Sequence, residues 1–227
     1  MTNTPPAPET GALIYWFDIS AAIVDDWLHW YLRDHMPSRV GTTFTTGRCF
    51  EAIAGPTSHM VMFETTTPEA LLAPDYLKLL GTVSDEDRKR RGWYSNTVRM
   101  TARVQRRMGT GIGSVLAVTR FDHTPHPEGP GAETPEPWPI DEIGSLPGVG
   151  SIWFARHDAS IRARMDQVRV TGHQDQSPRG ALLIESARDT DAQQAQAIAD
   201  ALLSRQAPDA AAGSCTGRYR LLYAMTA

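Results

Sequence analysis

The feature that most constrains the fold of this chain is an order of predicted elements that occurs twice along its 227 residues. Strands are indicated where aromatic and β-branched residues cluster or where apolar and polar residues alternate, and helices where apolar residues recur at helical spacing. In the first half these patterns predict strands at 12–19, 47–53, 59–65 and 97–104, and helices at 20–36 and 68–80. The order is therefore strand, helix, strand, strand, helix, strand.

After a flexible Gly-Thr-Gly-Ile-Gly joint at 109–113, the same order begins again in a weaker form. Strands are predicted at 115–121, 151–155, 180–186 and 218–225, with a helix at 190–203, a short helical remnant at 140–145 and a polar loop at 173–178. The segment 124–139 holds six prolines and two glycines, which indicates a surface loop where the first helix of this half would otherwise begin.

Two such units in tandem predict an α+β fold of two ferredoxin-like βαββαβ halves, with antiparallel sheets and helices on the outside. The first half is expected to span 11–109 and to carry the active site, and the degenerate second half to span 110–227. The Pro- and Thr-rich segment 1–10 lacks the basic flank and the apolar run of a signal peptide, so we expect a disordered tail there.

Charge and cysteine content exclude several classes of function. A formal net charge of -4 and a pI near 6.0 give no general attraction for nucleic acid or for an anionic membrane surface. Cys49 and Cys215 lie far apart and lack the spacing of a disulfide framework or a zinc site, which fits a reducing compartment. We therefore expect a cytoplasmic protein without metal, nucleic-acid or membrane partners.

One segment of the first half resembles a known family. Residues 27–39, with the sequence WLHWYLRDHMPSR, resemble a helix of the dimeric α/β-barrel superfamily that reads approximately W-Y-x-x-E/D-H-x-P-x-R. The matching residues are Trp30, Tyr31, Asp34, His35, Pro37 and Arg39. Further similarities are Phe50-Glu51-Ala52, Gly55-Pro56, Phe63-Glu64 and the segment 73–80. The second half matches only weakly, at Pro147-Gly148-Val149.

The resemblance implies that two ferredoxin-like sheets form one α/β barrel. In many members the two sheets come from two chains, so this chain either pairs its own halves or forms a homodimer. The family includes muconolactone isomerases, polyketide cyclases and monooxygenases, ether-degradation-associated proteins and haem-binding enzymes. We interpret the chain as a tandem member related to the muconolactone-isomerase-like and ether-degradation-associated proteins, although this fold does not fix function.

Two residues at the end of the first predicted helix are the main candidates for chemistry. His35 is expected to face the sheet, where a partly desolvated imidazole can act as a general acid or base. Arg39 can bind a substrate carboxylate in bidentate fashion. The alternatives are that His35 only caps the helix end and that Arg39 pairs with Asp34 or Glu51.

Other candidates complete the predicted site. His59 is a second proton-transfer group, and Arg103, which shares a strand face with Arg99, can supply positive charge to an acidic substrate. An aromatic substrate pocket is expected from Tyr15, Trp27 and Tyr31, although aromatic residues at such positions are often only core. The basic run at 88–91 is interpreted as a solvated helical face.

These residues lead to a hypothesis of a cofactor-independent isomerase or lyase that moves protons on a small, unsaturated, carboxylated intermediate of aromatic catabolism. One alternative is a cofactor-free monooxygenase acting on an electron-rich phenol, or a haem protein in which His35 or His157 supplies an axial nitrogen. The other is a protein that binds a small molecule without turnover.

Overall fold

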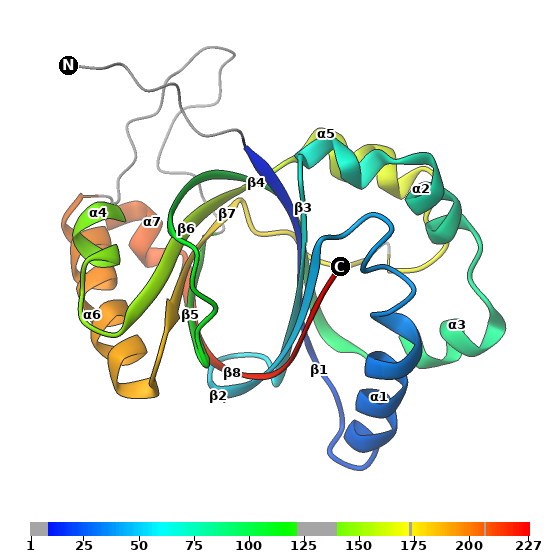
Figure 1. The fold of residues 1–227 in the computed structure, drawn as a ribbon, viewed down its shortest axis with the longest axis horizontal. Helices are drawn as coiled ribbons and strands as arrows, with labels where there is room; N and C mark the ends of the chain where they lie inside the picture. The colour runs from blue at the N-terminus through cyan, green and yellow to red at the C-terminus, as the bar shows by residue number, and fades with distance from the viewer. Residues whose placement is uncertain (1–8, 122–139, 173, 207) are drawn as a thin grey trace.

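The computed structural model describes residues 9–121, 140–172, 174–206 and 208–227, and these form one closed, antiparallel, eight-stranded barrel with helices on its outside (Figure 1). The strands are β1 (Thr10–Asp18), β2 (Thr46–Ala54), β3 (His59–Thr65), β4 (Ser95–Gly109), β5 (Val115–Phe121), β6 (Val149–His157), β7 (Gly180–Ser186) and β8 (Ser214–Thr226). The predicted α+β barrel of ferredoxin-like units is confirmed.

The order of the strands shows how the barrel closes. Around the barrel it is β1-β3-β2-β8-β5-β7-β6-β4, so each half contributes four neighbouring strands in the same internal order. The halves meet where β2 pairs with β8 and where β4 pairs with β6, both antiparallel. The barrel therefore closes within one chain, and no sheet edge is left open between the halves.

The helices lie in two groups on opposite sides of the barrel (Figure 1). The first group is α1 (Val24–Trp30), which continues into a π-helical turn (Tyr31–His35), a 3-10 turn (Pro68–Leu72), α2 (Pro74–Gly81), α3 (Asp85–Arg91) and α5 (Ala159–Asp166). The second group is α4 (Ile140–Gly144), α6 (Asp189–Gln206) and α7 (Pro208–Ala212). Pro74 separates the 3-10 turn from α2, as its missing N–H predicts.

Period-two alternation along the strands separates two environments. On β3, Met60 and Met62 point into the barrel, whereas Val61 and Phe63 pack under the first group of helices. The barrel interior is filled by a cluster that includes Trp16 and Trp153. The outer face of the second half packs under α4 and α6. The outer face of the first-half sheet therefore forms a core separate from the barrel interior.

Several elements differ from the sequence prediction. β1 begins at Thr10, inside the predicted tail, because that residue pairs with Val104. β4 runs on to Gly109, because its second part pairs with β6 of the other half. The predicted loop at 124–139 lies outside the described residues.

The largest difference is the β6–β7 connection (residues 158–179, with 173 not described), which contains α5 where only a polar loop was predicted. Asp158 caps α5 by accepting hydrogen bonds from the amides of Ser160 and Ile161, at 3.0 and 2.9 Å. Ile161 and Met165 of α5 then pack into the outer core of the first half. A segment of the second half thus covers the sheet of the first.

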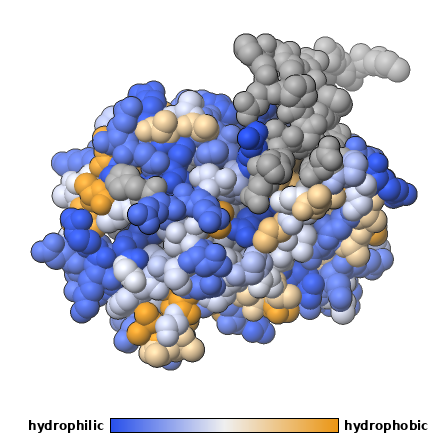
Figure 2. Space-filling view, turned by 180° about the vertical axis from the view of Figure 1, so that it is seen from behind, coloured by the Kyte–Doolittle hydropathy of each residue, from blue (hydrophilic) through white to orange (hydrophobic). Residues whose placement is uncertain are grey.

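Small apolar patches are scattered among polar residues on the face shown in Figure 2. Among the described residues, no helix has the length and hydropathy needed to span a membrane.

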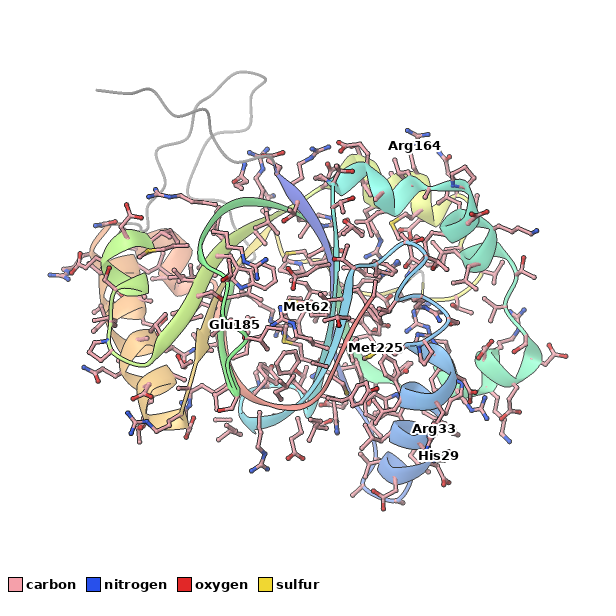
Figure 3. The ribbon with its side chains drawn as sticks, viewed as in Figure 1. His29, Arg33, Met62, Arg164, Glu185 and Met225 are labelled. Atoms are coloured by element: carbon pink, nitrogen blue, oxygen red, sulfur yellow. The ribbon has the colours of Figure 1, made fainter. Side chains whose placement is uncertain are left out.

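An ion network inside the barrel joins the two halves. Arg48 of β2 pairs with Glu64 of β3, at 2.8 Å, and with Glu185 of β7. Glu64 also pairs with Arg107 of β4, at 2.7 Å, and Glu185 accepts a hydrogen bond from the amide of Gly113, at 3.0 Å. Figure 3 shows Glu185 and Met62 lying in the barrel on strands of opposite halves. Because Arg48 and Glu185 have fully buried side chains, each depends on the other for neutralisation.

Replacing Arg48 should therefore cost much more stability than replacing an exposed arginine. We expect Arg48→Met to lower the free energy of unfolding by about 3–5 kcal/mol, because it leaves a buried carboxylate without its cation. The matched control is Arg220→Met, whose partner Glu51 lies at the surface, with an expected loss below about 1 kcal/mol. Urea unfolding of both variants measures the difference, and equal losses would contradict a structural role for the network.

Candidate functional site

A cavity of about 310 Å³ lies between the outer face of the first-half sheet and the helices that cover it. Strand residues such as Leu13 and Phe63 form its floor, and Tyr76 of α2 contributes to its wall. Residues of the π-helical turn, α3 and the β6–β7 connection complete the lining. Its volume is at the lower end of the range of about 300–1,000 Å³ that is typical of small-molecule sites.

The π-helical turn positions the first side chains of the site. The amide of Met36 donates to the carbonyl of Tyr31, at 2.8 Å, which is the i to i+5 bond of a π turn. Pro37 follows and has no N–H with which to continue the helix. Such turns occur frequently at functional sites. Here the turn places Tyr31, Asp34 and His35 on the cavity wall.

His35 is held in an aromatic and electropositive environment. Its ring lies against Trp30 and Tyr31, with centroid distances of 4.6 and 4.8 Å. Burial, together with the nearby charges of Arg39 and Arg91, holds the pKa of His35 well below its usual value. The imidazole is therefore neutral near pH 7 and is able to accept a proton.

Two guanidinium groups act on this histidine. Arg39 donates to the carbonyl of His35 and to the hydroxyl of Ser38, both at 2.8 Å, and no carboxylate of the described residues forms an ion pair with it. Glu51, which was one alternative partner for Arg39, pairs with Arg220 instead. Arg91 lies over the rings of Tyr15 and Tyr94, at 4.9 and 5.3 Å.

Two further arginines line the cavity from the sheet side. Arg99 of β4 is 3% exposed and Arg169 of the β6–β7 connection is 4% exposed. Burial, with the charge of Arg169 close by, lowers the pKa of Arg99 to about 10. Asp175 accepts hydrogen bonds from Arg169, at 3.0 Å, and from the hydroxyl of Tyr15, at 2.9 Å.

The structure brings four of the seven predicted site residues together. Tyr15, Tyr31, His35 and Arg39 all line the cavity. The other three lie outside its lining, each with partners of its own, as follows.

Trp27 is buried behind Tyr31 and donates its indole N–H to the hydroxyl of Tyr94, at 2.8 Å. His59 stacks on Phe17 and makes a hydrogen bond with Ser58, at 2.9 Å. Arg103 is paired with Asp158 and Glu69, both at 2.6 Å. These partners hold the three side chains away from the cavity.

Two arginines of the cavity were missed by the sequence interpretation. Arg91 belongs to the run that was interpreted as a solvated helical face, which is wrong for this residue because it points into the cavity. The sequence could have indicated a position facing the cavity, because Arg91 lies four residues after Asp87 and just before Trp93 and Tyr94. Arg169 carried no local signal, because barrel closure alone brings its segment to the first half.

Histidine, cysteine and acidic side chains do not gather into a metal site in the described part of the chain. His157, considered as an axial ligand, ends β6 and hydrogen-bonds through Nδ1 to the carbonyl of Thr101, at 3.0 Å. It does not line the cavity.

Searches with models of known protein families and among curated proteins found no match. Solved structures do match over nearly the whole chain. A protein from Fusobacterium nucleatum with a provisional monooxygenase name has a TM-score of 0.58 at 8% identity, covering 96% of this chain and 95% of that one. An anthrone oxidase-like protein has a TM-score of 0.57 at 8% identity, covering 97% and 94%. A haem-binding protein from Thermus thermophilus has a TM-score of 0.50 at 8% identity, covering 97% and 96%.

Identities this low establish a common α/β-barrel fold and no more. The comparisons correct the sequence hypothesis in one respect. These neighbours are named as oxidative or haem-binding proteins, so the isomerase or lyase function and the closer relation to muconolactone isomerases are not supported. The alternative of a monooxygenase or a haem-binding protein fits the neighbours better.

The lowered pKa of His35 predicts a specific loss of stability in acid. As the pH falls below about 6.5, the unfolded chain binds a proton before the folded chain does. Above that pH, His35 causes no loss of stability. Below it, the free energy of unfolding falls by at most about 1.4 kcal/mol per pH unit, until the folded-state pKa is reached. The variant His35→Gln lacks this loss.

Urea unfolding of wild type and His35→Gln should therefore give free energies whose difference shifts in favour of the variant between about pH 7.5 and about pH 5.5. His59 and His157 contribute equally to both proteins and cancel in the comparison. A difference that stays constant with pH would contradict a neutral His35.

Proposed function

We propose that this chain is a cofactor-independent oxygenase that uses O₂ to oxidise an electron-rich, hydroxylated aromatic molecule. The observation that carries the proposal is a neutral histidine in a cavity with aromatic walls, beside the guanidinium groups of Arg39 and Arg91, which form no ion pair with a carboxylate in the described part of the chain. The names of the monooxygenase and anthrone oxidase-like neighbours support the same class of reaction.

The residues suit a reaction that begins with loss of a proton. His35 would accept the acidic proton of a hydroxylated aromatic ketone or phenol as a general base. Arg39 and Arg91 would stabilise the resulting enolate or phenolate, because both act on the site through their positive charge. Trp30, Tyr31 and Tyr76 would hold the flat ring and exclude water.

The anion formed in this way is electron-rich enough to reduce O₂ directly. One electron passes to O₂, the two radicals combine to form a C–O bond, and the peroxide takes up the proton. Loss of water from this hydroperoxide turns a CH₂ group into a carbonyl. One substrate and one O₂ thus give one ketone and one water, so no external reductant is required.

Haem is the other group that the neighbours suggest. It requires an axial ligand, and His35 is the histidine that lines the cavity. The volume of about 310 Å³ is small for a porphyrin with two propionates. The residues therefore fit haem poorly, and we derive no step through it.

Oxygen uptake with 1,8-dihydroxyanthrone as substrate tests the proposal. We expect uptake by wild type, formation of the corresponding anthraquinone, and a rate that falls by about 10²- to 10⁴-fold in His35→Gln, because the general base is lost. The control is His29→Gln, since His29 is exposed on α1 and lies outside the cavity lining (Figure 3).

Three results would count against an oxygenase of this kind. The first is no uptake with this compound or with related hydroxyanthrones and naphthols. The second is equal loss of rate in the two histidine variants, which would remove the role of His35. The third is a Soret band after incubation with haem, accompanied by activity only in the haem-loaded protein, which would favour the haem-binding alternative.

A further inference from the structure

Among the described residues, Arg99 on the sheet side of the cavity has no close carboxylate partner. Arg99 is almost completely buried, and its Nη1 atom makes no hydrogen bond among the described residues. The carboxylate that forms an ion pair with it belongs to Asp166, whose Oδ1 atom is 3.9 Å from Nη1. This distance is too long for a hydrogen bond.

The acids near Arg99 also form ion pairs with other arginines. Asp166 pairs with Arg162, at 2.7 Å, and with Arg169, at 2.9 Å. Asp175 binds Arg169 and the hydroxyl of Tyr15. A buried guanidinium whose ion pair is this long is costly, and Arg99 lines the cavity, so it indicates a place for an anion there.

Arg99 belongs to a different part of the cavity from the proposed base. His35 lines the cavity from the π-helical turn, whereas Arg99 and Arg169 line it from β4 and from the β6–β7 connection. Arg39 is tied to the helix end through the carbonyl of His35, and Arg99 stands on β4 of the sheet. One ligand can therefore present its reactive ring to His35 and a separate anionic group to Arg99.

We propose that the substrate is a hydroxylated aromatic carboxylic acid whose carboxylate binds Arg99, with Arg169 beside it. This inference rests on the proposed function for the reactive ring, but the carboxylate site stands on its own geometry. Arg169 comes from the β6–β7 connection, so the second half of the chain contributes directly to substrate selection. Neutral aromatic compounds of the same shape would leave the charge of Arg99 without an anionic partner in the cavity.

Isothermal titration calorimetry with matched naphthalenes tests this assignment without requiring turnover. The probes are 6-hydroxy-2-naphthoate and 6-hydroxy-2-naphthamide, which share the hydroxylated ring and differ in the charge of one group. We expect the carboxylate to bind wild type about 10- to 100-fold more tightly, because a charge-assisted hydrogen bond forms in a buried site. A ratio below about three-fold would overturn the proposal.

Variants then identify the residue responsible. Arg99→Met should bind the two probes with nearly equal affinity. The control Arg164→Met, on the exposed side of α5 where Figure 3 shows Arg164 at the edge of the molecule, should keep the preference of wild type. If Arg99→Met folds, as judged by circular dichroism, and keeps the preference, Arg99 is not the anion site. If Arg99→Met does not fold, the ratio of the two affinities measured with wild type decides whether the proposal holds.

The two proposals fail in different ways. A carboxylate preference without any oxygen uptake would leave the anion site intact and remove the oxygenase function. Oxygen uptake with neutral hydroxyanthrone, together with equal affinity for the two naphthalenes, would keep the oxygenase and overturn the aromatic acid as its substrate.

Discussion

Closure of the barrel within one chain is the constraint on which the rest of this structure depends. The β2–β8 and β4–β6 pairings fix the two halves relative to each other, and the buried Arg48 network links them from inside. Because β4 and β6 are neighbours, the β6–β7 connection emerges beside the outer face of the first-half sheet. The position of α5, and hence of Arg169 on the cavity wall, follows from that pairing.

The arginines inside the barrel and those in the cavity differ in their ion-pair partners. Inside the barrel, Arg48 has two carboxylate partners, and each of these carboxylates has a further donor. In the cavity, Arg39 has no ion pair among the described residues and Arg99 has only a distant one. The same chain can thus neutralise a buried guanidinium where the structure requires it. The contrast makes an anionic ligand a better explanation of the cavity than a need for stability.

Much of the fold could be predicted from local patterns, and the failures have physical reasons. β3 was predicted at its observed bounds because its flanking turn residues and strand-forming residues are both strong. His35 and Arg39, which line the cavity, were singled out because a helix end marked by Pro37 carries a recognisable motif. α5 was missed because its apolar residues pack against the other half, and Arg91 because its charge conceals its burial beside Tyr15 and Tyr94. Both errors involve a contact with a distant segment, the first half for α5 and Tyr15 for Arg91.

The asymmetry of the two halves has a consequence for stoichiometry. A barrel assembled from two identical half-length chains would repeat every residue, and therefore every pocket, about its twofold axis. Here the outer face of the second half packs under α4 and α6, while the described cavity uses side chains of both halves. Because the two halves are joined in one chain, the sequence of each half can change independently of the other. A ligand of the described cavity should therefore show hyperbolic saturation, with one equivalent bound per chain at this cavity.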